Sequence, residues 1–297
     1  MTDGIDSVSL SVMALFLDLD NTILPSKGAY DYALKQCAID WKERKLGDDF
    51  LELYESARKQ VKSQLKHHSS NRLRLLCFKL MFEMLRSNFK KNSSLNVASL
   101  EDPKLEANME NGFQTQDITE IFWMEERYFF HFLSFYKEEK NKDEYQTSLF
   151  PKLVSLSQEF PIYLTTNETL RTQLLKVQGF LPADFRFTLI TSEEVGFEKP
   201  SKEFFQYVME KTKEDPSDCI LLGDNWEDDI IGASSHGISC IHVPEMWGKG
   251  DEVKECSNPL NSPTDKTASP HPVSIWKAPN ILSGLNFARL WLFQRQK

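Results

Sequence analysis

Short apolar runs alternate with helical periodicities along much of the 297-residue chain. Four apolar runs, each stopping at a polar or charged residue, cover residues 11–18, 161–166, 219–224 and 238–243. Strands that are covered on both faces are continuously hydrophobic, so these runs predict buried parallel strands. Helical patterns lie between these runs, at 169–180, 201–213 and 228–237. This alternation predicts a doubly wound, parallel-sheet α/β core.

The alternation is interrupted by a mostly helical region between Tyr30 and about Gln146. Apolar residues recur there at spacings of three and four over 49–65, 71–85 and 118–136. We therefore expect an all-helical domain of residues 30–146, inserted between core segments 1–29 and 147–297.

Two polar stretches predict loops. Residues 87–117 are rich in Asn and Ser, which favours a long mobile loop within the insertion. Residues 248–274 hold four prolines and almost no apolar periodicity, which favours a surface loop or linker. An amphipathic segment, 275–293, follows and is expected to close the core.

Two carboxylates, Asp18 and Asp20, follow the first apolar run. Residues two apart on a strand point to the same side of a sheet, so both carboxylates can face one site. In open α/β sheets, ligands bind at this edge. By itself the pair is equally explained by a solvated strand end or by an Asp that caps a helix.

The other predicted strands end in polar residues at the same edge. The second run ends in Thr166 and is followed by Asn167, the third ends in Asp224, and Lys199 precedes a helix. A hydroxyl, an ammonium group and several carboxylates together predict a site for a phosphate and a hard cation, because magnesium prefers oxygen ligands.

These segments resemble the four motifs of the haloacid dehalogenase superfamily. The motifs occur in order as DLDNT (18–22), LTTN (164–167), KPSKEFF (199–205) and GDNWEDDIIGA (223–233). The resemblance extends over about residues 11–29 and 150–247. It implies a Mg²⁺-dependent hydrolase of phosphate monoesters with a Rossmann-like core. Dehalogenases of the superfamily lack the second aspartate, so Asp20 disfavours carbon–halogen cleavage.

The resemblance also implies a role for each residue. Asp18 is expected to attack phosphorus, and Asp20 to protonate the leaving oxygen and then to activate water. Lys199, the hydroxyl group of Thr166 and the backbone amide of Asn167 are expected to bind the phosphoryl oxygens. Thr166 is preferred to its neighbour in this role because the family places the hydroxyl directly before Asn.

The expected magnesium ligands are Asp18, the backbone carbonyl of Asp20, Asp224 and one further carboxylate. Asp228 and Asp229 compete for the last position, because neighbours lie about 100° apart around a helix. The resemblance favours Asp229, which precedes an apolar pair and two small residues. The spacing of Asp228 from Asp224 also occurs in the family. An unperturbed Asp has a pKa of about 3.9, so a site that crowds Asp20 with carboxylates would help it to hold a proton, while magnesium would oppose this.

The helical insertion resembles the cap of many phosphatases in the superfamily, which favours a small substrate such as a sugar phosphate or a nucleotide. The combination is similar to the branch that includes N-acylneuraminate-9-phosphatase and pyrimidine nucleotidases. Arg72 and Arg74 are candidates for substrate selection, although solvated helix charge is the commoner explanation for an arginine in such a position. A phosphomutase of the same fold and a non-catalytic binding protein are the alternatives.

Composition narrows the function classes further. The formal charge of −9 gives no broad footprint for nucleic acid or anionic membranes. The five cysteines form no C-x-x-C pair, which fits a reducing cytoplasm. The N-terminal segment is acidic where a signal peptide is basic, and no run approaches the roughly 20 apolar residues of a membrane helix. We therefore expect a cytoplasmic protein with a small-molecule phosphate ester as its partner.

Overall fold

The computed structural model describes residues 13–66, 68–96, 115–257 and 273–295. The chain divides into a core unit, Met1–Lys27 with Tyr136–Lys297, and a helical unit, Gly28–Phe135. The boundaries expected from the sequence were residues 30 and 146. Each unit is described by itself.

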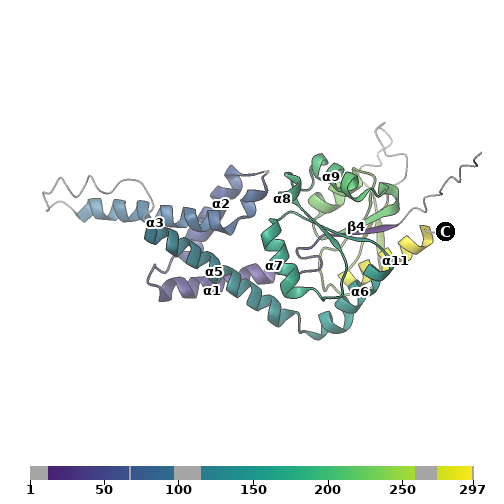
Figure 1. Cartoon of the computed structure of the whole chain (residues 1–297), viewed down its shortest axis with the longest axis horizontal. Helices are drawn as coiled ribbons and strands as arrows, with labels where there is room; N and C mark the ends of the chain where they lie inside the picture. Colours follow the sequence, from purple (N-terminus) through teal and green to yellow (C-terminus); the bar gives the residue numbers. More distant parts are fainter. Residues whose placement is uncertain (1–12, 67, 97–114, 258–272, 296–297) are drawn as a thin grey trace, which may run out of the picture. The chain divides into compact units, whose positions relative to one another are not determined.

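The core unit contains a seven-stranded sheet in the order β3-β2-β1-β4-β5-β7-β6. Figure 1 labels the central strand β4 and the helices α6, α7, α8, α9 and α11 of this unit. The strands are β1 (Ala14–Leu17), β2 (Ile162–Thr166), β3 (Thr188–Thr191), β4 (Cys219–Gly223), β5 (Ser239–His242), β6 (Lys254–Cys256) and β7 (Ile275–Lys277). All neighbours are parallel except β6, which runs antiparallel to β7. The chain adds β2 and β3 on one side of β1 and then returns to add β4 on the other. Such a reversal of strand order is where open α/β sheets bind ligands.

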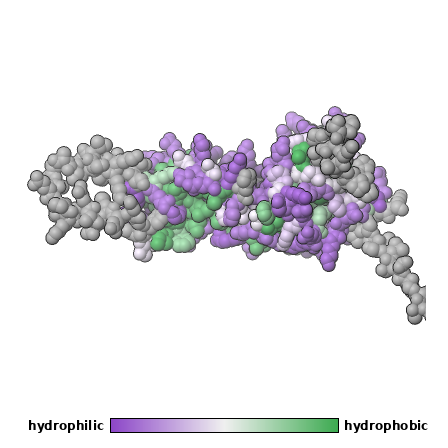
Figure 2. Space-filling view, turned by 90° about the horizontal axis from the view of Figure 1, so that it is seen from above, coloured by the Kyte–Doolittle hydropathy of each residue, from purple (hydrophilic) through white to green (hydrophobic). Residues whose placement is uncertain are grey.

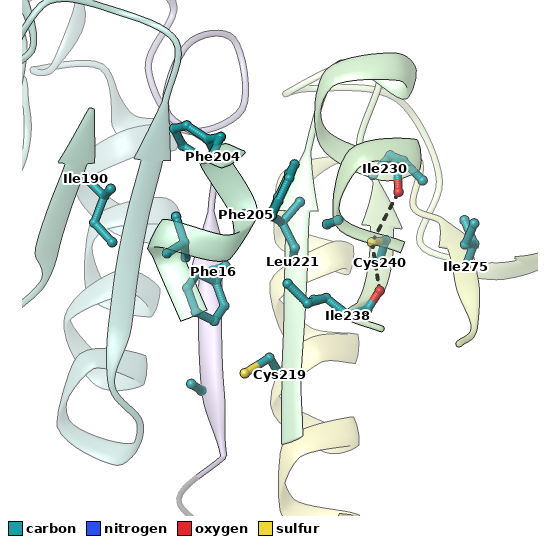
Figure 3. Close-up of a cluster of buried hydrophobic side chains, with 13 residues drawn as sticks. Phe16, Ile190, Phe204, Phe205, Cys219, Leu221, Ile230, Ile238, Cys240 and Ile275 are labelled. Carbon is teal, nitrogen blue, oxygen red and sulfur yellow. Dashed lines mark hydrogen bonds between the residues drawn. The ribbon is translucent and has the colours of Figure 1, made fainter. Parts of the chain in front are cut away.

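Helices and helical turns connect these strands. They are η2 (Glu144–Leu149), α6 (Phe150–Glu159), α7 (Leu170–Phe180), α8 (Ser192–Val195), α9 (Lys202–Thr212), η3 (Pro216–Asp218), η4 (Trp226–Ile231), α10 (Gly232–Ser234) and α11 (Ile281–Arg295). On one face of the sheet, Phe204 and Phe205 of α9 pack with Phe16, Leu221 and Ile230 in a buried cluster (Figure 3). Successive strand residues point to opposite faces, so Leu222 lies on the other face, within 3.2 Å of a Cβ built on Gly284 of α11. Both faces of the sheet are therefore covered, as the sequence predicted.

The helical unit is built around aromatic side chains. Its elements are α1 (Ser26–Glu43), α2 (Phe50–Gln64), η1 (Ser69–Arg72), α3 (Arg74–Asn96) and α5 (Thr115–Glu139), of which α1 and α5 continue into the core unit. The ring of Trp41 lies 5.5 Å from Phe50 and 5.4 Å from Phe82, and Tyr128 stacks on Phe132 at 5.7 Å. Pairs at such distances stabilise beyond the area that they bury. The periodic apolar residues of the insertion therefore form a core of their own.

Apolar side chains also reach the surface of the helical unit. Figure 2 shows apolar surface there among hydrophilic residues. Among the described residues of this unit, the large exposed apolar side chains are Ile39, Leu51, Ile118, Phe122 and Phe130. Within the described ranges, no helix combines the length and the apolar character needed to cross a membrane.

Several local predictions were wrong. The predicted loop 87–117 is helical at both ends, because α3 continues to Asn96 and α5 begins at Thr115; residues 97–114 lie outside the described ranges. Extending a nucleated helix fixes one residue per hydrogen bond, so the polar end of α3 needs no apolar pattern of its own. The predicted loop 248–274 contains strand β6, and 258–272 are not described. Strands β3, β6 and β7 were missed; β6 lies in the stretch interpreted as a loop, and β7 lies at the start of the segment 275–293 that was interpreted as amphipathic.

Candidate active site

Polar residues gather where the three central strands end. Leu17 of β1 pairs in register with Leu164 of β2 and Leu222 of β4. The chain therefore leaves these three strands at nearly the same level, and the residues that follow meet at one edge. Asp18 is the first residue after β1 and Asp224 the first after β4.

Asp18 is 6% exposed and lies in the middle of this edge. Its Oδ1 accepts a 2.7 Å hydrogen bond from Lys199 Nζ, and its Oδ2 accepts one of 3.1 Å from the hydroxyl group of Thr22. Burial raises the pKa of Asp18 well above its ordinary value, and the carboxylates of Asp229 and Asp224 raise it further, while Lys199 opposes them. The site thus disfavours the negative charge of Asp18 beside the other carboxylates unless a positive charge is added.

Three carboxylates lie close enough together to bind a metal cation. Asp18, Asp224 and Asp229 each offer a ligand oxygen, and these oxygens lie within 4.8 Å of one another. Burial and the charge of Asp229 raise the pKa of Asp224 to about 6, although Lys199 lowers it. An all-oxygen donor set with excess negative charge fits a hard divalent cation. Gly223 leaves room for this group, because an added Cβ would collide with the Asp229 carboxylate.

Lys199 supplies the positive charge of the site. Its ammonium group is buried and donates to Asp18 Oδ1 at 2.7 Å, to Asp229 Oδ1 at 2.5 Å and to the carbonyl oxygen of Thr165 at 3.0 Å. Burial alone would lower the pKa of Lys199, but the two carboxylates outweigh it and raise the pKa above its ordinary value. The lysine therefore remains charged.

The side chain of Asn167 positions this lysine. Asn167 Oδ1 accepts a 2.7 Å hydrogen bond from the backbone amide of Lys199, and Asn167 Nδ2 donates to the Lys199 carbonyl oxygen at 2.9 Å. The amide group thus joins the end of β2 to the segment before α9. The sequence assigned only the backbone amide of Asn167 to the site, so this side-chain function was missed.

Two threonines end β2, and both are buried. The Thr166 hydroxyl oxygen accepts a 2.7 Å hydrogen bond from Gln173 Nε2. The Thr165 hydroxyl group has no hydrogen-bond partner among the described residues. A hydroxyl that already accepts a hydrogen bond keeps its own proton free to donate, as a phosphate-binding group must.

Asp20 has partners that the sequence analysis did not foresee. Lys176 Nζ donates to Asp20 Oδ1 at 2.6 Å, and Gln173 Nε2 donates to Asp20 Oδ2 at 2.7 Å. Burial raises the pKa of Asp20, but the charge and hydrogen bond of Lys176 outweigh it, helped by Ser26 and Gln173, so the pKa is lowered. The sequence indicated crowding of Asp20 by carboxylates but not a buried lysine beside it.

Asp228 and Asp229 differ in their surroundings. Asp229 is 1% exposed, and its Oδ2 also accepts a hydrogen bond of 3.1 Å from the backbone amide of Asn225. Asp228 is half-buried outside the three-carboxylate group, and its Oδ2 accepts from the side chains of Asn225 at 3.1 Å and Asn167 at 3.5 Å. Both residues lie in η4, a π-helical turn. This turn begins at Trp226, two residues before the predicted helix 228–237.

Arg72 and Arg74 belong to the helical unit and are half-buried. Arg74 Nε donates to the hydroxyl group of Tyr128 at 3.2 Å, and its guanidinium group lies 4.8 Å from the ring centre of Tyr30. These contacts give Arg74 a structural role within its own unit. Selection of substrate by either arginine stays a prediction.

Sequence comparison identifies relatives among phosphatases. The chain is 26% identical over 233 residues to ribulose-1,5-bisphosphate 5-phosphatase from Halopiger xanaduensis, which covers 77% of this chain and 83% of that protein. It is 27% identical over 109 residues to N-acylneuraminate-9-phosphatase from Mus musculus, covering 36% of this chain and 42% of that protein. A pyrimidine 5'-nucleotidase, YjjG of Escherichia coli, is 33% identical over 79 residues, covering 26% of this chain and 35% of that protein.

Structural comparison and a family model agree on the fold. A 2-haloacid dehalogenase from Pseudomonas syringae matches with a TM-score of 0.56 at 18% identity, covering 94% of this chain and 99% of that chain. The model of haloacid dehalogenase-like hydrolases matches residues 12–237, which contain all four motifs and the helical unit. The resemblance in the motifs is therefore confirmed, and the chain belongs to the haloacid dehalogenase-like hydrolases.

Proposed function

We propose that this hydrolase cleaves small phosphate monoesters through an aspartyl-phosphate formed on Asp18. One observation carries the proposal: the buried Asp18 carboxylate lies at the end of the central strand, in contact with Lys199 and beside Asp224 and Asp229. A nucleophile, a fixed cationic donor and a carboxylate set for a metal together fit phosphoryl transfer. Its named relatives are phosphatases of small phosphorylated metabolites.

In the first step, a carboxylate oxygen of Asp18 attacks phosphorus. The new bond joins this oxygen to phosphorus, and the bond from phosphorus to the ester oxygen breaks. The electron pair of the broken bond stays on the leaving oxygen, which takes a proton from Asp20. Because the pKa of Asp20 is lowered, only the minor, protonated form of Asp20 carries out this step. Lys199 and the Thr166 hydroxyl group offset charge on the phosphoryl oxygens by donating hydrogen bonds.

In the second step, water cleaves the aspartyl-phosphate. Asp20, now ionised, accepts a proton from water as the water oxygen attacks phosphorus. The bond from phosphorus to the Asp18 oxygen breaks, which releases inorganic phosphate and restores the Asp18 carboxylate. With the proton taken from water, Asp20 is again protonated, and Asp18 and Asp20 are ready for another turnover.

The carboxylates of Asp18, Asp224 and Asp229, with the backbone carbonyl of Asp20, are the groups that would hold magnesium. Bound magnesium would neutralise charge on the phosphoryl group and on these carboxylates. The raised pKa values of Asp18 and Asp224 support this assignment, because crowded carboxylates that resist ionisation are the groups that a cation would stabilise.

We assign the helical unit the role of a cap that contributes to substrate selection. An inserted unit with its own aromatic core supports this role. The phosphatases among the relatives act on a sugar bisphosphate, an acylneuraminate phosphate and pyrimidine nucleotides, so we expect a phosphorylated sugar or nucleotide here as well.

Replacement of the nucleophile tests the proposed chemistry. We expect Asp18→Asn to abolish phosphate release from phosphate esters, because an amide does not form the aspartyl-phosphate. Phosphate release and circular dichroism are measured on the same preparations. A folded Asp18→Asn protein with turnover near that of the wild type would contradict the mechanism. Release of inorganic phosphate, rather than transfer to a second sugar, separates a phosphatase from a phosphomutase.

A further inference from the structure

Helix α7 buries the wrong residues for an ordinary surface helix. Gln173 and Lys176 are fully buried, whereas Leu170 and Leu174 of the same helix are 40% and 51% exposed. Burying an amide and an ammonium group while exposing two leucines is unfavourable unless the buried groups are paired. Such departures from the rules of folding are expected at functional sites.

Lys176 is paired with two carboxylates. Its ammonium group donates to Asp20 Oδ1 at 2.6 Å and lies 3.8 Å from Glu168 Oε2. Glu168 is itself buried, and its Oε1 accepts a 2.9 Å hydrogen bond from the backbone amide of Thr169. The lysine is therefore held from two sides, which restricts where its contact with Asp20 can lie.

Gln173 connects two groups of the site. Its Nε2 atom has two protons, one directed to Asp20 Oδ2 and one to the Thr166 hydroxyl oxygen, both at 2.7 Å. Asp20 thus has one carboxylate oxygen held by Lys176 and the other by Gln173. The Oε1 atom of Gln173 is buried and has no hydrogen-bond partner among the described residues. A leucine there would avoid that cost but would leave Asp20 Oδ2 and the Thr166 hydroxyl oxygen without this donor, so the amide is tied to these two groups.

We propose that Gln173 and Lys176 are positioning residues for phosphoryl transfer. Lys176 sets the orientation of the Asp20 carboxyl group. Gln173 fixes that group and the Thr166 hydroxyl group relative to each other. Proton transfer to the leaving oxygen and recognition of the phosphoryl oxygens are then aligned by a single side chain. This inference rests on the proposed function, in which Asp20 transfers the proton and Thr166 binds phosphate.

The two residues predict different kinetic defects. Lys176→Met should act mainly on proton transfer, because Lys176 donates a hydrogen bond to Asp20, whereas Gln173 donates to both Asp20 and Thr166. Gln173→Leu should affect both proton transfer and phosphate binding, and so also raise KM. p-Nitrophenyl phosphate has a leaving group that departs without a proton, whereas glycerol 1-phosphate needs one. If the two residues position Asp20, the loss of rate should depend on the leaving group. A general loss of stability would lower the rate equally with both esters.

The experiment uses full-length wild type, Lys176→Met, Gln173→Leu and the control Gln178→Leu, which changes an exposed residue of the same helix. Rapid-quench measurement of the first turnover separates transfer to Asp18 from later hydrolysis. We expect the first-turnover rate with glycerol 1-phosphate to fall about 100-fold in both variants, the lower end of general-acid contributions, and with p-nitrophenyl phosphate far less. Gln178→Leu should match the wild type.

Thermal unfolding of each variant accompanies the kinetics. Equal losses with both esters, or unchanged rates in folded variants, would overturn the positioning role. If Lys176→Met does not fold because Asp20 and Glu168 lose their cation, Gln173→Leu, which removes no charge, decides the question. A wild-type protein that releases phosphate from neither ester would instead overturn the proposed function.

Discussion

Asp229 and Asp228 are adjacent in the chain, but only Asp229 is buried beside Asp18 and Asp224. Asp229 also accepts hydrogen bonds from Lys199 and from the backbone amide of Asn225. These bonds fix its carboxylate before any cation arrives, and a fixed carboxylate loses little freedom on binding. The half-buried Asp228 binds two asparagine side chains instead.

We therefore expect Asp229→Asn to weaken magnesium binding by about 10- to 100-fold, the range seen when groups that support a metal are removed. Asp228→Asn should bind magnesium nearly as well as the wild type. Calorimetric titration of chelator-treated protein measures binding directly, and phosphate release at each magnesium concentration measures its effect. A larger loss in Asp228→Asn would reverse the assignment.

Helix α9 begins two residues after the Lys199–Pro200 segment and carries Phe204 and Phe205 into the core. Its N-cap is Ser201, whose hydroxyl oxygen accepts a 3.2 Å hydrogen bond from the backbone amide of Phe204. A helix whose first amides lack such a partner is less stable. The cap therefore stabilises the start of the helix that follows Lys199 and that packs on the sheet through Phe204 and Phe205.

Ser201→Ala should lower the stability of the core unit by about 1 kcal/mol, as the loss of an N-cap commonly does. Ser201→Asn retains an acceptor and should remain close to the wild type. Differential scanning calorimetry compares the three proteins. Equal unfolding temperatures for Ser201→Ala and the wild type would show that the cap contributes little.

Helices α1 and α5 of the helical unit are joined by a charged cluster. Asp40 accepts hydrogen bonds from Arg127 at 2.7 Å and from His131 at 2.6 Å, and its side chain is only 13% exposed. Burial raises the pKa of Asp40, but the bonds from Arg127 and His131 outweigh it, so the pKa lies below its ordinary value. The ionised form is the one that stabilises the fold.

The sign of the pH dependence follows from this lowered pKa. The stabilisation is complete above the unfolded pKa of about 3.9 and is lost as the pH falls through the lower folded value. Asp40→Asn should therefore unfold at a lower temperature than the wild type at pH 7, and the difference should narrow below about pH 4. The control is Asp48→Asn, since Lys42 and Asp48 are 74% and 78% exposed and such pairs contribute little. A difference that does not change with pH would contradict the role of the ionised Asp40.

At the scale of the whole molecule, the chain combines a sheet that carries the candidate catalytic groups with a helical unit inserted directly after the first strand. The insertion enters at Gly28, ten residues after Asp18, and the chain returns to the core unit at Tyr136. The two parts have separate cores, so the helical unit can vary without disturbing the sheet. We assign chemistry to the core unit and substrate choice to the helical unit on this basis.

This division predicts that changes in the helical unit alter substrate preference more than chemistry. Arg72→Ala and Arg74→Ala should change the ratio of kcat/KM between a sugar phosphate and a nucleoside monophosphate, while p-nitrophenyl phosphate is cleaved with nearly unchanged kcat. Lys79→Ala is the control, because Lys79 pairs with Glu83 on the exposed side of α3. Identical ratios in all four proteins would remove both arginines from substrate selection. Arg74→Ala also loses its contact with Tyr128, so its folding is checked in parallel.

The order of the elements and the position of the candidate groups at strand ends were determined by the sequence alone. The run 161–166 is followed directly by Asn167 and the run 219–224 ends at Asp224, and covalent continuity places such residues at the edge where the strands end. Strand β6 lies in a polar stretch and β7 at the start of an amphipathic segment, so neither has the continuous apolar run that identifies a buried strand, and both were missed.

Which side chains meet at that edge was decided only by the tertiary structure. Apolar character alone would place Leu170 and Leu174 inside and Gln173 and Lys176 outside, yet the reverse is observed. The physical reason is that a buried Asp20 needs a cation and a donor within hydrogen-bond distance, and α7 supplies both across more than 150 residues of intervening chain. A hydrophobic pattern records the average solvent exposure of a helix face, whereas the pairing of buried charges depends on distances that only the folded chain establishes.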